Sequence, residues 1–300
     1  MTAVAVTPRS FRETPGEHLD RLRAELDVRF PEVDRPLDEE EMVELVRGCE
    51  GLIVGVDPVT ARVLEAGPLR VVVKYGSGMD NVDVAAAERR GVRVSSTPGA
   101  NARSVAELAV ALLLALARNV ATHDRGVRQG SWKRRTGVEL VGKRLGIVGY
   151  GAIGREVAEI ARGGVGMEVV AHDPLVAEAA VPLLPLDEVL ATSDALSLHL
   201  PLTDETRGLI GASELAAMKP TAFLVNTARG GLVDEVALAD ALQSGQLAGA
   251  ALDGFEEEPL GVSPLRALDN VVLSPHAGAA TREAVLRTAS RAVDQLLRDL

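Results

Sequence analysis

The stretch Arg144–Gly154 constrains the fold of this chain more than any other segment. A short apolar run, Arg144-Leu-Gly-Ile-Val, leads directly into the glycine-rich sequence Gly149-Tyr-Gly151-Ala-Ile-Gly154. This spacing is typical of a strand-to-helix turn that holds a dinucleotide. Gly149 allows the tight bend, Gly151 lets the backbone approach a pyrophosphate, and Gly154 lets the helix pack closely on the strand. The phosphates would lie at the helix N-terminus, where free N–H groups and the helix dipole favour an anion.

Alone, such a motif can be no more than a tight turn, but the next predicted strand strengthens the interpretation. Met167–His172 is followed by Asp173, about twenty residues after the turn, where a carboxylate can accept hydrogen bonds from the adenosine ribose. A carboxylate at this position also repels a 2′-phosphate, and Pro174–Ala180 contains no Arg or Lys to hold one. The sequence therefore favours NAD over NADP.

Composition narrows the class of protein and its partners. The formal charge of −11 over 300 residues argues against nucleic acid or an anionic membrane as partner. The single cysteine, Cys49, excludes an internal disulfide and fits a reducing compartment. The longest apolar run, Val105–Ala117, contains Glu107 and is too short to span a bilayer. We expect a cytoplasmic protein, and we expect no metal because no Cys/His cluster has ligand spacing.

Short β-branched runs alternate with helical stretches along the whole chain, which predicts parallel sheets. The expected strands are Val4–Val6, Asp27–Phe30, Leu52–Val54, Val71–Val73, Val92–Val94, Arg144–Val148, Met167–His172, Ala195–Leu200, Ala222–Thr227, Leu247–Leu252 and Val271–Ser274. The pattern breaks near Thr97-Pro98-Gly99, as Pro-Gly usually signals. A helix apolar on nearly every side follows, over about Ala102–Asn119, and we expect it to be buried between domains or subunits. A last helix, capped by Thr281, runs to the C-terminus.

The position of the glycine turn predicts the domain organisation. Because the turn comes only at residue 149, a complete α/β unit precedes it. The last helix can return to that first unit and make it discontinuous. We therefore expect an α/β protein with two doubly wound parallel sheets, a Rossmann NAD domain (97–279) inserted into a flavodoxin-like substrate domain (1–96 plus 280–300).

Motifs over almost the whole chain resemble those of the D-isomer-specific 2-hydroxyacid dehydrogenase family. The likeness is closest to phosphoglycerate dehydrogenase-like members without a regulatory domain. Besides the glycine turn, the matching stretches are Lys74–Asp83, Thr97–Asn101 followed by Ser104–Glu107, His199–Thr203, Asn226–Gly231 with Val233–Glu235, Ala251–Pro259 and Ser274–Gly278. The resemblance implies an NAD-dependent enzyme that moves a hydride between the nicotinamide and a small anionic 2-hydroxy or 2-keto acid.

The resemblance also implies a catalytic set, and each member has a chemical reason. His276 follows a strand, where loops of such sheets form sites, and an imidazole titrates in the range of a general base. Glu258, the last of three adjacent acids, would accept the other imidazole N–H. Arg229 can hold a carboxylate bidentately. The ordinary alternatives are a loop histidine, a solvated acidic loop and a structural ion pair.

Further binding residues follow from the same resemblance. For the cofactor they are Ser77, Gly149, Gly151, Ala152, Ile153, Gly154, Asp173, Pro201, Thr227, Ala228, Arg229, Asp253, His276, Gly278 and Ala279. For the substrate they are Lys74, Tyr75, Gly76, Ser77, Gly78, Asn101 and Arg229. The loop Gly76–Gly78 would hold the substrate carboxylate with its backbone amides. Family dimer elements resemble the helix from Ala102 and the Trp132 loop, so we expect a homodimer.

Two features bear on the substrate, and one rival function stays open. Gly55-Val-Asp57-Pro58 stands where phosphoglycerate dehydrogenases tend to carry an Arg, which disfavours 3-phosphoglycerate and favours a compact acid such as glyoxylate or hydroxypyruvate. Lys133, Arg134 and Arg135 could instead reach a distal phosphate of a substrate in a partner subunit, or could simply be a solvated loop. Substrate identity and physiological direction stay open.

The rival function is a non-catalytic, NAD-sensing corepressor on the same fold.

Overall fold

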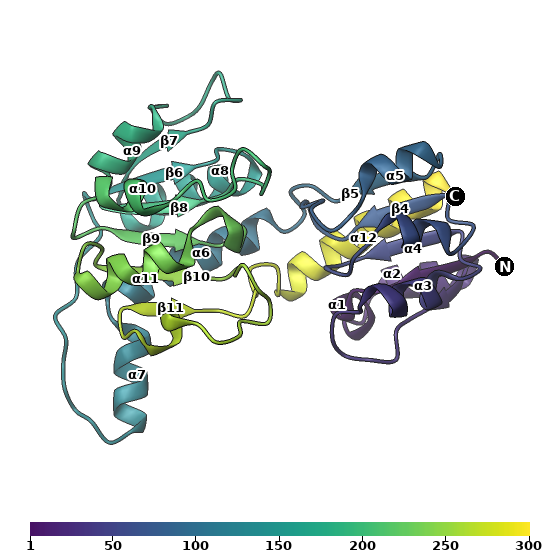
Figure 1. The fold of residues 1–300 in the computed structure, drawn as a ribbon, viewed down its shortest axis with the longest axis horizontal. Coiled ribbons are helices and arrows are strands. Elements are labelled where there is room, and N and C mark those ends of the chain that lie inside the picture. Colours follow the sequence, from purple (N-terminus) through teal and green to yellow (C-terminus); the bar gives the residue numbers. More distant parts are fainter. The chain divides into compact units, whose positions relative to one another are not determined.

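The computed structural model describes residues 1–300 (Figure 1). Chain contacts divide them into two compact units, here called the first unit (Met1–Asn101 with Ala279–Leu300) and the second unit (Ala102–Gly278). From the sequence we expect the boundaries after residues 96 and 279. Each unit is built on its own parallel sheet.

The first unit alternates strands and helices along the chain. Its strands are β1 (Ala3–Val6), β2 (Asp27–Arg29), β3 (Gly51–Val54), β4 (Val71–Lys74) and β5 (Arg93–Ser96). Its helices are α1 (Arg9–Glu13), α2 (Glu17–Glu25), α3 (Glu39–Val46), α4 (Ala61–Glu65), α5 (Val84–Arg89) and α12 (Arg282–Asp299). The side chain of Thr281 caps α12 as predicted, accepting the Ala284 N–H at 3.2 Å.

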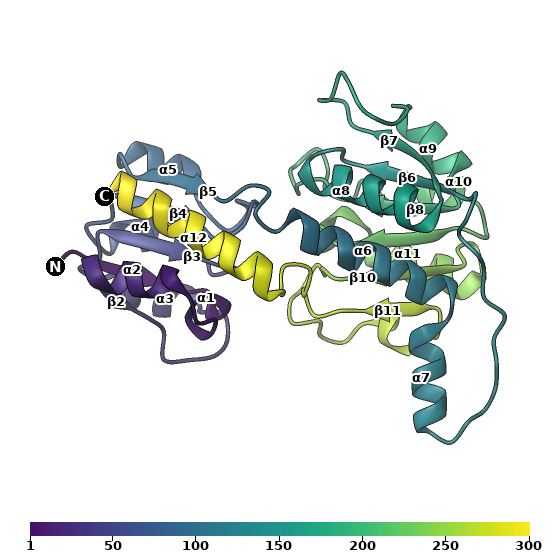
Figure 2. The same cartoon turned by 180° about the vertical axis from the view of Figure 1, so that it is seen from behind.

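The sheet of the first unit has the order β2-β1-β3-β4-β5, with every pair parallel. β3 and β4 are buried on both faces, which explains their continuous Val/Ile/Leu runs. Helices α1, α2 and α12 cover one face, and α3, α4 and α5 cover the other (Figures 1 and 2). The strand order reverses between β1 and β3, which is where sheets of this kind usually bind ligands.

One face of α12 is fastened to the segment that leads out of β5. Arg287 Nε donates to the Ala100 carbonyl at 2.9 Å, Arg291 Nη1 to Pro98 at 2.9 Å, and Gln295 Nε2 to Ser96 at 2.8 Å. The chain is thus held on α12 up to the residue before Asn101, where it leaves the first unit.

The second unit contains the glycine-rich turn. Its strands are β6 (Arg144–Val148), β7 (Glu168–His172), β8 (Ala195–Leu198), β9 (Phe223–Asn226), β10 (Gly249–Leu252) and β11 (Val271–Leu273). Its helices are α6 (Ala102–Ala117), α7 (Val120–Arg128), α8 (Ala152–Ile160), α9 (Leu186–Thr192), α10 (Ala212–Ala217) and α11 (Glu235–Ser244), with a π-helical turn η1 (Ala161–Val165) and 3₁₀ turns η2 (Gly230–Leu232) and η3 (Pro264–Ala267).

The second sheet has the order β11-β10-β9-β8-β6-β7, again all parallel. A parallel bridge between Ala171 and Leu183 extends it beyond β7. The order reverses at β6, directly before the glycine turn. Helices α9, α10 and α11 lie on one face, and α6 and α8 on the other (Figures 1 and 2). The predicted pair of doubly wound parallel sheets is confirmed.

Helix α6 is a core helix of the second unit. It packs on α8 and on β9 and β10, and residues such as Ala106, Val110 and Leu113 belong to that unit's core. This packing accounts for most of the apolar surface that the sequence assigned to a domain or subunit boundary. The helix ends at Ala117, slightly before the predicted Asn119, because Asn119 adopts a left-handed conformation with φ 54°.

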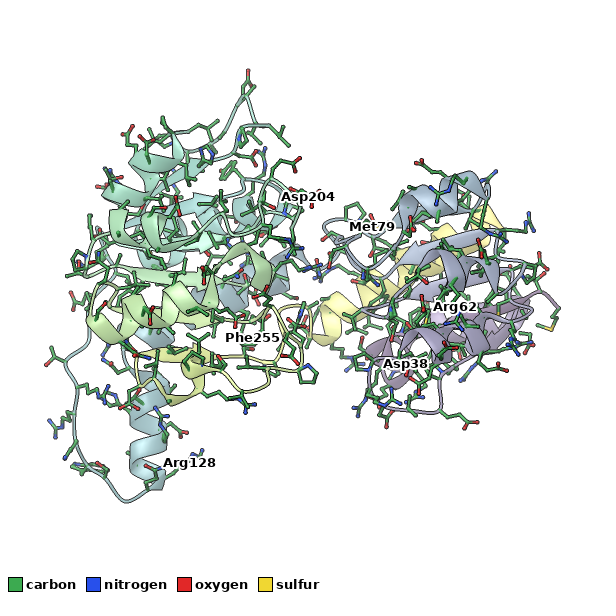
Figure 3. The ribbon with its side chains drawn as sticks, viewed as in Figure 1. Asp38, Arg62, Met79, Arg128, Asp204 and Phe255 are labelled. Carbon is green, nitrogen blue, oxygen red and sulfur yellow. The ribbon has the colours of Figure 1, made fainter.

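Helix α7 and the loop after it project from the second unit (Figures 1 and 2). No residue of α7 is buried, and Arg128, labelled in Figure 3, marks its outer end. Val120, Val127 and Trp132 are 53%, 55% and 79% exposed. This arm therefore carries apolar side chains that nothing in the chain covers.

Candidate active site

Three glycines shape the turn after β6. Gly149 has φ +93°, and a Cβ there would lie 2.6 Å from the carbonyl oxygen of His199. A Cβ on Gly154 would lie 2.2 Å from the Gly149 carbonyl oxygen, so a side chain would push α8 away from the strand. Gly151 has no atom within 4 Å of its Cβ position and leads into Ala152, the first residue of α8. Open space thus meets a helix N-terminus, which fits a pyrophosphate.

Asp173 follows β7 and supports the glycine turn. Its Oδ2 accepts the Tyr150 N–H at 2.8 Å, and its Oδ1 accepts the Leu175 N–H at 3.0 Å. Each carboxylate oxygen can accept a further hydrogen bond. The carboxylate thus has a structural task in addition to the ribose contact that the sequence predicts.

Two buried polar atoms lie at the ends of neighbouring strands without a partner in the protein. They are Nδ1 of His199 and Oγ1 of Thr227, which follow the paired residues Leu198 of β8 and Asn226 of β9. Burial lowers the pKa of His199 to about 3, so its ring is neutral at physiological pH. An unpartnered buried polar atom costs about 1–3 kcal/mol, so two at one edge fit a ligand with hydrogen-bonding groups.

His276 and Glu258 form a close pair. The Nδ1 atom of His276 lies 2.8 Å from Oε2 of Glu258 and 3.0 Å from its Oε1. The same Oε1 accepts the Phe255 N–H at 3.0 Å, which fixes the carboxylate. The two side chains remain 37% and 35% exposed. Because Nδ1 is engaged, Nε2 is the ring nitrogen that remains for a substrate.

The pair shifts both pKa values toward the charged forms. The hydrogen bond to Glu258 raises the pKa of His276, and this outweighs the opposing effect of burial. Burial would raise the pKa of Glu258, but hydrogen bonds from His276 and Phe255 together lower it. An imidazolium–carboxylate pair is therefore favoured over a wider pH range than in isolated side chains.

Arg229 lies half-buried after β9. Its Nη1 donates to the Ala228 carbonyl at 2.9 Å. Asn226 fixes the turn, because its Nδ2 donates to the Arg229 carbonyl at 2.7 Å and its Oδ1 accepts the Ala228 N–H at 3.0 Å. The charge of Arg229 adds a small contribution to the lowered pKa of Glu258 and opposes part of the rise in the pKa of His276, so these three predicted residues share one electrostatic environment.

Asp253 holds the loop that carries His276. Its two carboxylate oxygens accept the Ala277 N–H at 2.7 Å and the Gly278 N–H at 2.8 Å, and the residue is 2% exposed. His276 itself has φ 53°, a left-handed conformation that costs about 1–2 kcal/mol in a residue with a side chain. Strain of this kind gathers at functional sites. The contact of Asp253 to the nicotinamide carboxamide stays a prediction.

The loop after β4 has two backbone amides without an acceptor in the protein. Gly76 is clamped to Thr97, with its N–H donating to Oγ1 at 2.8 Å and its carbonyl accepting the Thr97 N–H at 2.9 Å. The N–H groups of Ser77 and Gly78 donate no hydrogen bond within the protein. That Ser77 and Gly78 bind the substrate stays a prediction. Asn101, the other predicted substrate contact in the first unit, directly precedes α6.

Two side chains assigned to substrate binding point elsewhere. Lys74 is 5% exposed, and its ammonium donates to the Gly55 carbonyl and to Asn81 Oδ1. Tyr75 packs edge-on against Phe11, and its hydroxyl donates to the Val285 carbonyl in α12 at 3.1 Å. Burial raises the pKa of Tyr75 to about 12. Both side chains thus have hydrogen-bond partners within the first unit, and their contact with a substrate stays a prediction.

Sequence reasoning missed the residues that hold the predicted ones in place. Asn226 fixes the turn after β9 by two hydrogen bonds, Thr97 holds Gly76 by two, and the Phe255 N–H donates one to Glu258. A polar residue at the end of a buried apolar strand is the signal that could have identified Asn226. Thr97 follows the largely polar strand β5 and has no such signal.

No group of three or more His, Cys, Asp or Glu side chains is placed to hold a metal ion. No single helix is long and apolar enough to cross a membrane. Helices α6 and α7 reach that length and composition only together, as a pair bent by 65°.

Known proteins match this chain, in sequence and in fold, over nearly the whole of its length. Residues 110–278 match the family model of the D-isomer specific 2-hydroxyacid dehydrogenase NAD binding domain. The chain is 42% identical to a glyoxylate reductase of Korarchaeum cryptofilum, over 97% of this chain and 92% of the relative. It is 39% identical to a hydroxypyruvate reductase of Thermotoga maritima, over 97% and 98%. The crystal structure of the TT0316 protein of Thermus thermophilus superposes with a TM-score of 0.90 at 42% identity, covering 99% and 96%.

The chain belongs to the D-isomer specific 2-hydroxyacid dehydrogenase family. It is an NAD-dependent oxidoreductase that moves a hydride between the nicotinamide and a small 2-hydroxy or 2-keto acid. It spans about half the length of its phosphoglycerate dehydrogenase relatives, 52% of the one from Synechocystis sp. at 39% identity. These relatives are enzymes, which supports catalysis over the corepressor alternative.

Proposed function

We propose that His276, Glu258 and Arg229 catalyse the reduction of a compact 2-keto acid. The observation that carries this proposal is the bond of His276 Nδ1 to Glu258 at 2.8 Å beside the charge of Arg229. A carboxylate that fixes one ring nitrogen leaves the other to exchange a proton with substrate.

NADH, which the turn Gly149–Gly154 and Asp173 would hold, would supply the hydride for the keto carbon. His276, as imidazolium, donates the Nε2 proton to the keto oxygen as that oxygen gains charge. Glu258 keeps the ring oriented through Nδ1–H and stabilises the imidazolium. Arg229 pairs with the substrate carboxylate and orients the carbonyl, because a guanidinium fork matches a carboxylate. In the oxidation the same nitrogen of His276, now neutral, takes the hydroxyl proton.

We also propose that the loop after β4 binds a substrate carboxylate. The N–H groups of Ser77 and Gly78 donate no bond within the protein, so they are available to carboxylate oxygens, and Asn101 adds a polar contact. We propose this backbone site in place of direct contact by the Lys74 and Tyr75 side chains, which are hydrogen-bonded within the first unit.

The cofactor assignment is likewise a proposal at the level of residues. The turn Gly149–Gly154 and the amides of Ala152 and Ile153 would hold the pyrophosphate, and Asp173 the adenosine ribose. The free Thr227 hydroxyl, Asp253 and the His276 loop would line the nicotinamide end. Ser77, Pro201, Ala228, Gly278 and Ala279 complete the predicted set.

We propose glyoxylate or hydroxypyruvate as the substrate class. Relatives named for these two activities are 42% and 39% identical over 97% of the chain. The test is NADH consumption across a panel of 2-keto acids that includes glyoxylate, hydroxypyruvate, pyruvate and phosphohydroxypyruvate. We expect turnover of the small acids. Tight NADH binding without turnover of any keto acid would reject the proposal.

We also propose that the protein acts as a homodimer in the cytoplasm. The uncovered apolar side chains of the α7 arm support the dimer. The lone, buried Cys49 is compatible with a reducing compartment.

A further inference from the structure

Three buried polar residues lie at or just beyond the carboxyl ends of adjacent strands in the first unit's sheet. Thr7 follows β1, Asp57 lies in the loop after β3, and Lys74 ends β4; they are 7%, 5% and 5% exposed. Burying a cation and an anion is costly unless each is fully hydrogen-bonded. Their bonds therefore indicate what the cluster does.

Asp57 closes the crevice between β1 and β3. Its carboxylate accepts the Thr7 hydroxyl and, at 2.8 Å, the Leu37 N–H. The Thr7 oxygen in turn accepts the Gly55 N–H at 3.1 Å. This is the point where the strand order reverses, and protein groups fill it. The carboxylate of Asp57 therefore points into the protein and is hydrogen-bonded there.

Lys74 joins the loop after β3 to the loop after β4. Its ammonium donates to the Gly55 carbonyl and, at 2.5 Å, to Asn81 Oδ1. Asn81 Nδ2 then donates to the carbonyls of Gly55 at 3.0 Å and Asp57 at 2.5 Å. Met79, labelled in Figure 3, lies in the short stretch of chain between the two joined residues. A single buried cation thus holds both loops.

The loop after β4, here called the substrate loop (residues 76–81), is consequently fixed at both ends. Thr97 clamps Gly76 at its start, through two hydrogen bonds of 2.8 and 2.9 Å. The bond between Lys74 and Asn81 closes the loop at its other end. Between these two fixed points lie the Ser77 and Gly78 amides, which donate to no protein acceptor.

We propose that Lys74 is a positioning residue that orients the Ser77 and Gly78 amides toward the substrate carboxylate, acting through Asn81 and not by contact with the substrate. This inference rests on the proposed function and deepens it. Substrate recognition by this loop then comes from backbone dipoles, and neither Lys74 nor Asp57 adds a charge to it.

The test compares Lys74→Met, Asn81→Ala and the double variant in steady-state reduction of glyoxylate and hydroxypyruvate. Lys143→Met is the matched control, because it removes the same charge from the second unit. If Lys74 acts through Asn81, each single variant should raise KM about tenfold, as expected for roughly 1.4 kcal/mol of lost binding. The value of kcat should stay within about threefold, since uniform binding is lost. The double variant should resemble the single ones, because both remove one connected interaction.

Two other roles for Lys74, direct contact with the substrate and a purely structural role, predict different changes in KM and kcat. If Lys74 contacts the substrate directly, Asn81→Ala should leave KM unchanged or lower it, and the effects should add; either result overturns the inference. A purely structural role would lower kcat through loss of active enzyme while KM stays constant, which also overturns it. Should Lys74→Met fail to fold, Asn81→Ala decides alone by whether KM rises. Absence of turnover in the wild type would reject the proposed function, and this inference with it.

Discussion

The Nδ1 atom of His276 faces both carboxylate oxygens of Glu258, 2.8 Å from one and 3.0 Å from the other. This arrangement raises the pKa of His276, and the sign of the shift has a kinetic consequence. A raised pKa keeps the imidazolium, the acid needed for reduction, present at higher pH. The neutral base needed for oxidation appears only as the pH rises through that pKa.

The first prediction concerns pH dependence. Glu258→Gln removes the group that raises the pKa of His276, so the falling limb of the pH profile for reduction should move to lower pH. The same substitution at the neighbouring Glu257 should leave the profile unchanged, because Glu257 makes no bond to the histidine. Profiles of kcat/KM against pH provide the measurement; an unshifted limb in Glu258→Gln would remove the pair from the mechanism.

The second prediction concerns His276 itself. His276→Asn removes the proton donor but leaves Asp253 bound to the Ala277 and Gly278 amides. We expect kcat to fall by about 10²-fold or more, the usual size for losing general acid–base catalysis. NADH affinity, measured by fluorescence, should change little. A variant that keeps most of its kcat would show that another group transfers the proton.

The third prediction separates the charge of Asp173 from its structural bonds. Asp173→Asn removes the negative charge but keeps one acceptor oxygen for a backbone amide, so the NADPH/NADH ratio of kcat/KM should rise by about tenfold, or about 1.4 kcal/mol. Asp173→Ala also leaves the amides of Tyr150 and Leu175 without a partner and should cost about 1–3 kcal/mol of stability. A wild type that already prefers NADPH would refute this role.

The fourth prediction concerns assembly. Val127→Asp places a charge on the exposed apolar side of α7 and should shift a dimer to monomer in light scattering, with NADH binding retained. Trp132 is the only tryptophan and is 79% exposed, so its emission should shift to the blue as concentration drives association. A wild type that is monomeric at all concentrations would exclude the dimer.

The fifth prediction concerns a second anionic group on the substrate. Arg135 pairs with Asp269 of its own chain at 2.7 Å, whereas the side chains of Lys133 and Arg134 make no hydrogen bond or ion pair within the chain. Lys133→Ala/Arg134→Ala should therefore lower kcat/KM for phosphohydroxypyruvate selectively over hydroxypyruvate if a partner's loop binds the phosphate. Arg135→Ala is the control. Equal effects on both substrates would identify the triplet as an ordinary solvated loop.

Much of the fold could be predicted from local patterns, because strands buried on both faces leave continuous β-branched runs and glycine turns have a fixed spacing. The direction in which the Lys74 side chain points could not be predicted in this way. β4 is buried on both faces, so no alternation of polar and apolar residues shows which way its last side chain points. Its orientation depends on Gly55 and Asn81 in other loops.

In the candidate site, too, features with a sequence motif could be predicted, whereas those set by tertiary packing could not. The sequence brought Arg229, Glu258 and His276 together through motif resemblance, and the structure places Glu258, not its neighbours Glu256 or Glu257, on the histidine. The groups that support this set are backbone amides and a buried Asn226, whose partners are set by tertiary packing. The π-helical turn at Ala161–Val165 was likewise not predicted, since it comes from one extra residue per hydrogen-bonded turn and leaves no periodic signal.

The fastening of Arg287 to the Ala100 carbonyl, at 2.9 Å, has a consequence for how such a chain can be cut and rejoined. Both polypeptide connections to the second unit leave the first unit from this one place, since α12 begins at Arg282, only about one and a half turns before Arg287. A short flexible linker from Asn101 to Ala279 should therefore replace the entire inserted unit. The resulting miniature protein would keep its own sheet, both helical layers and the substrate loop, as a self-sufficient fold without cofactor or chemistry.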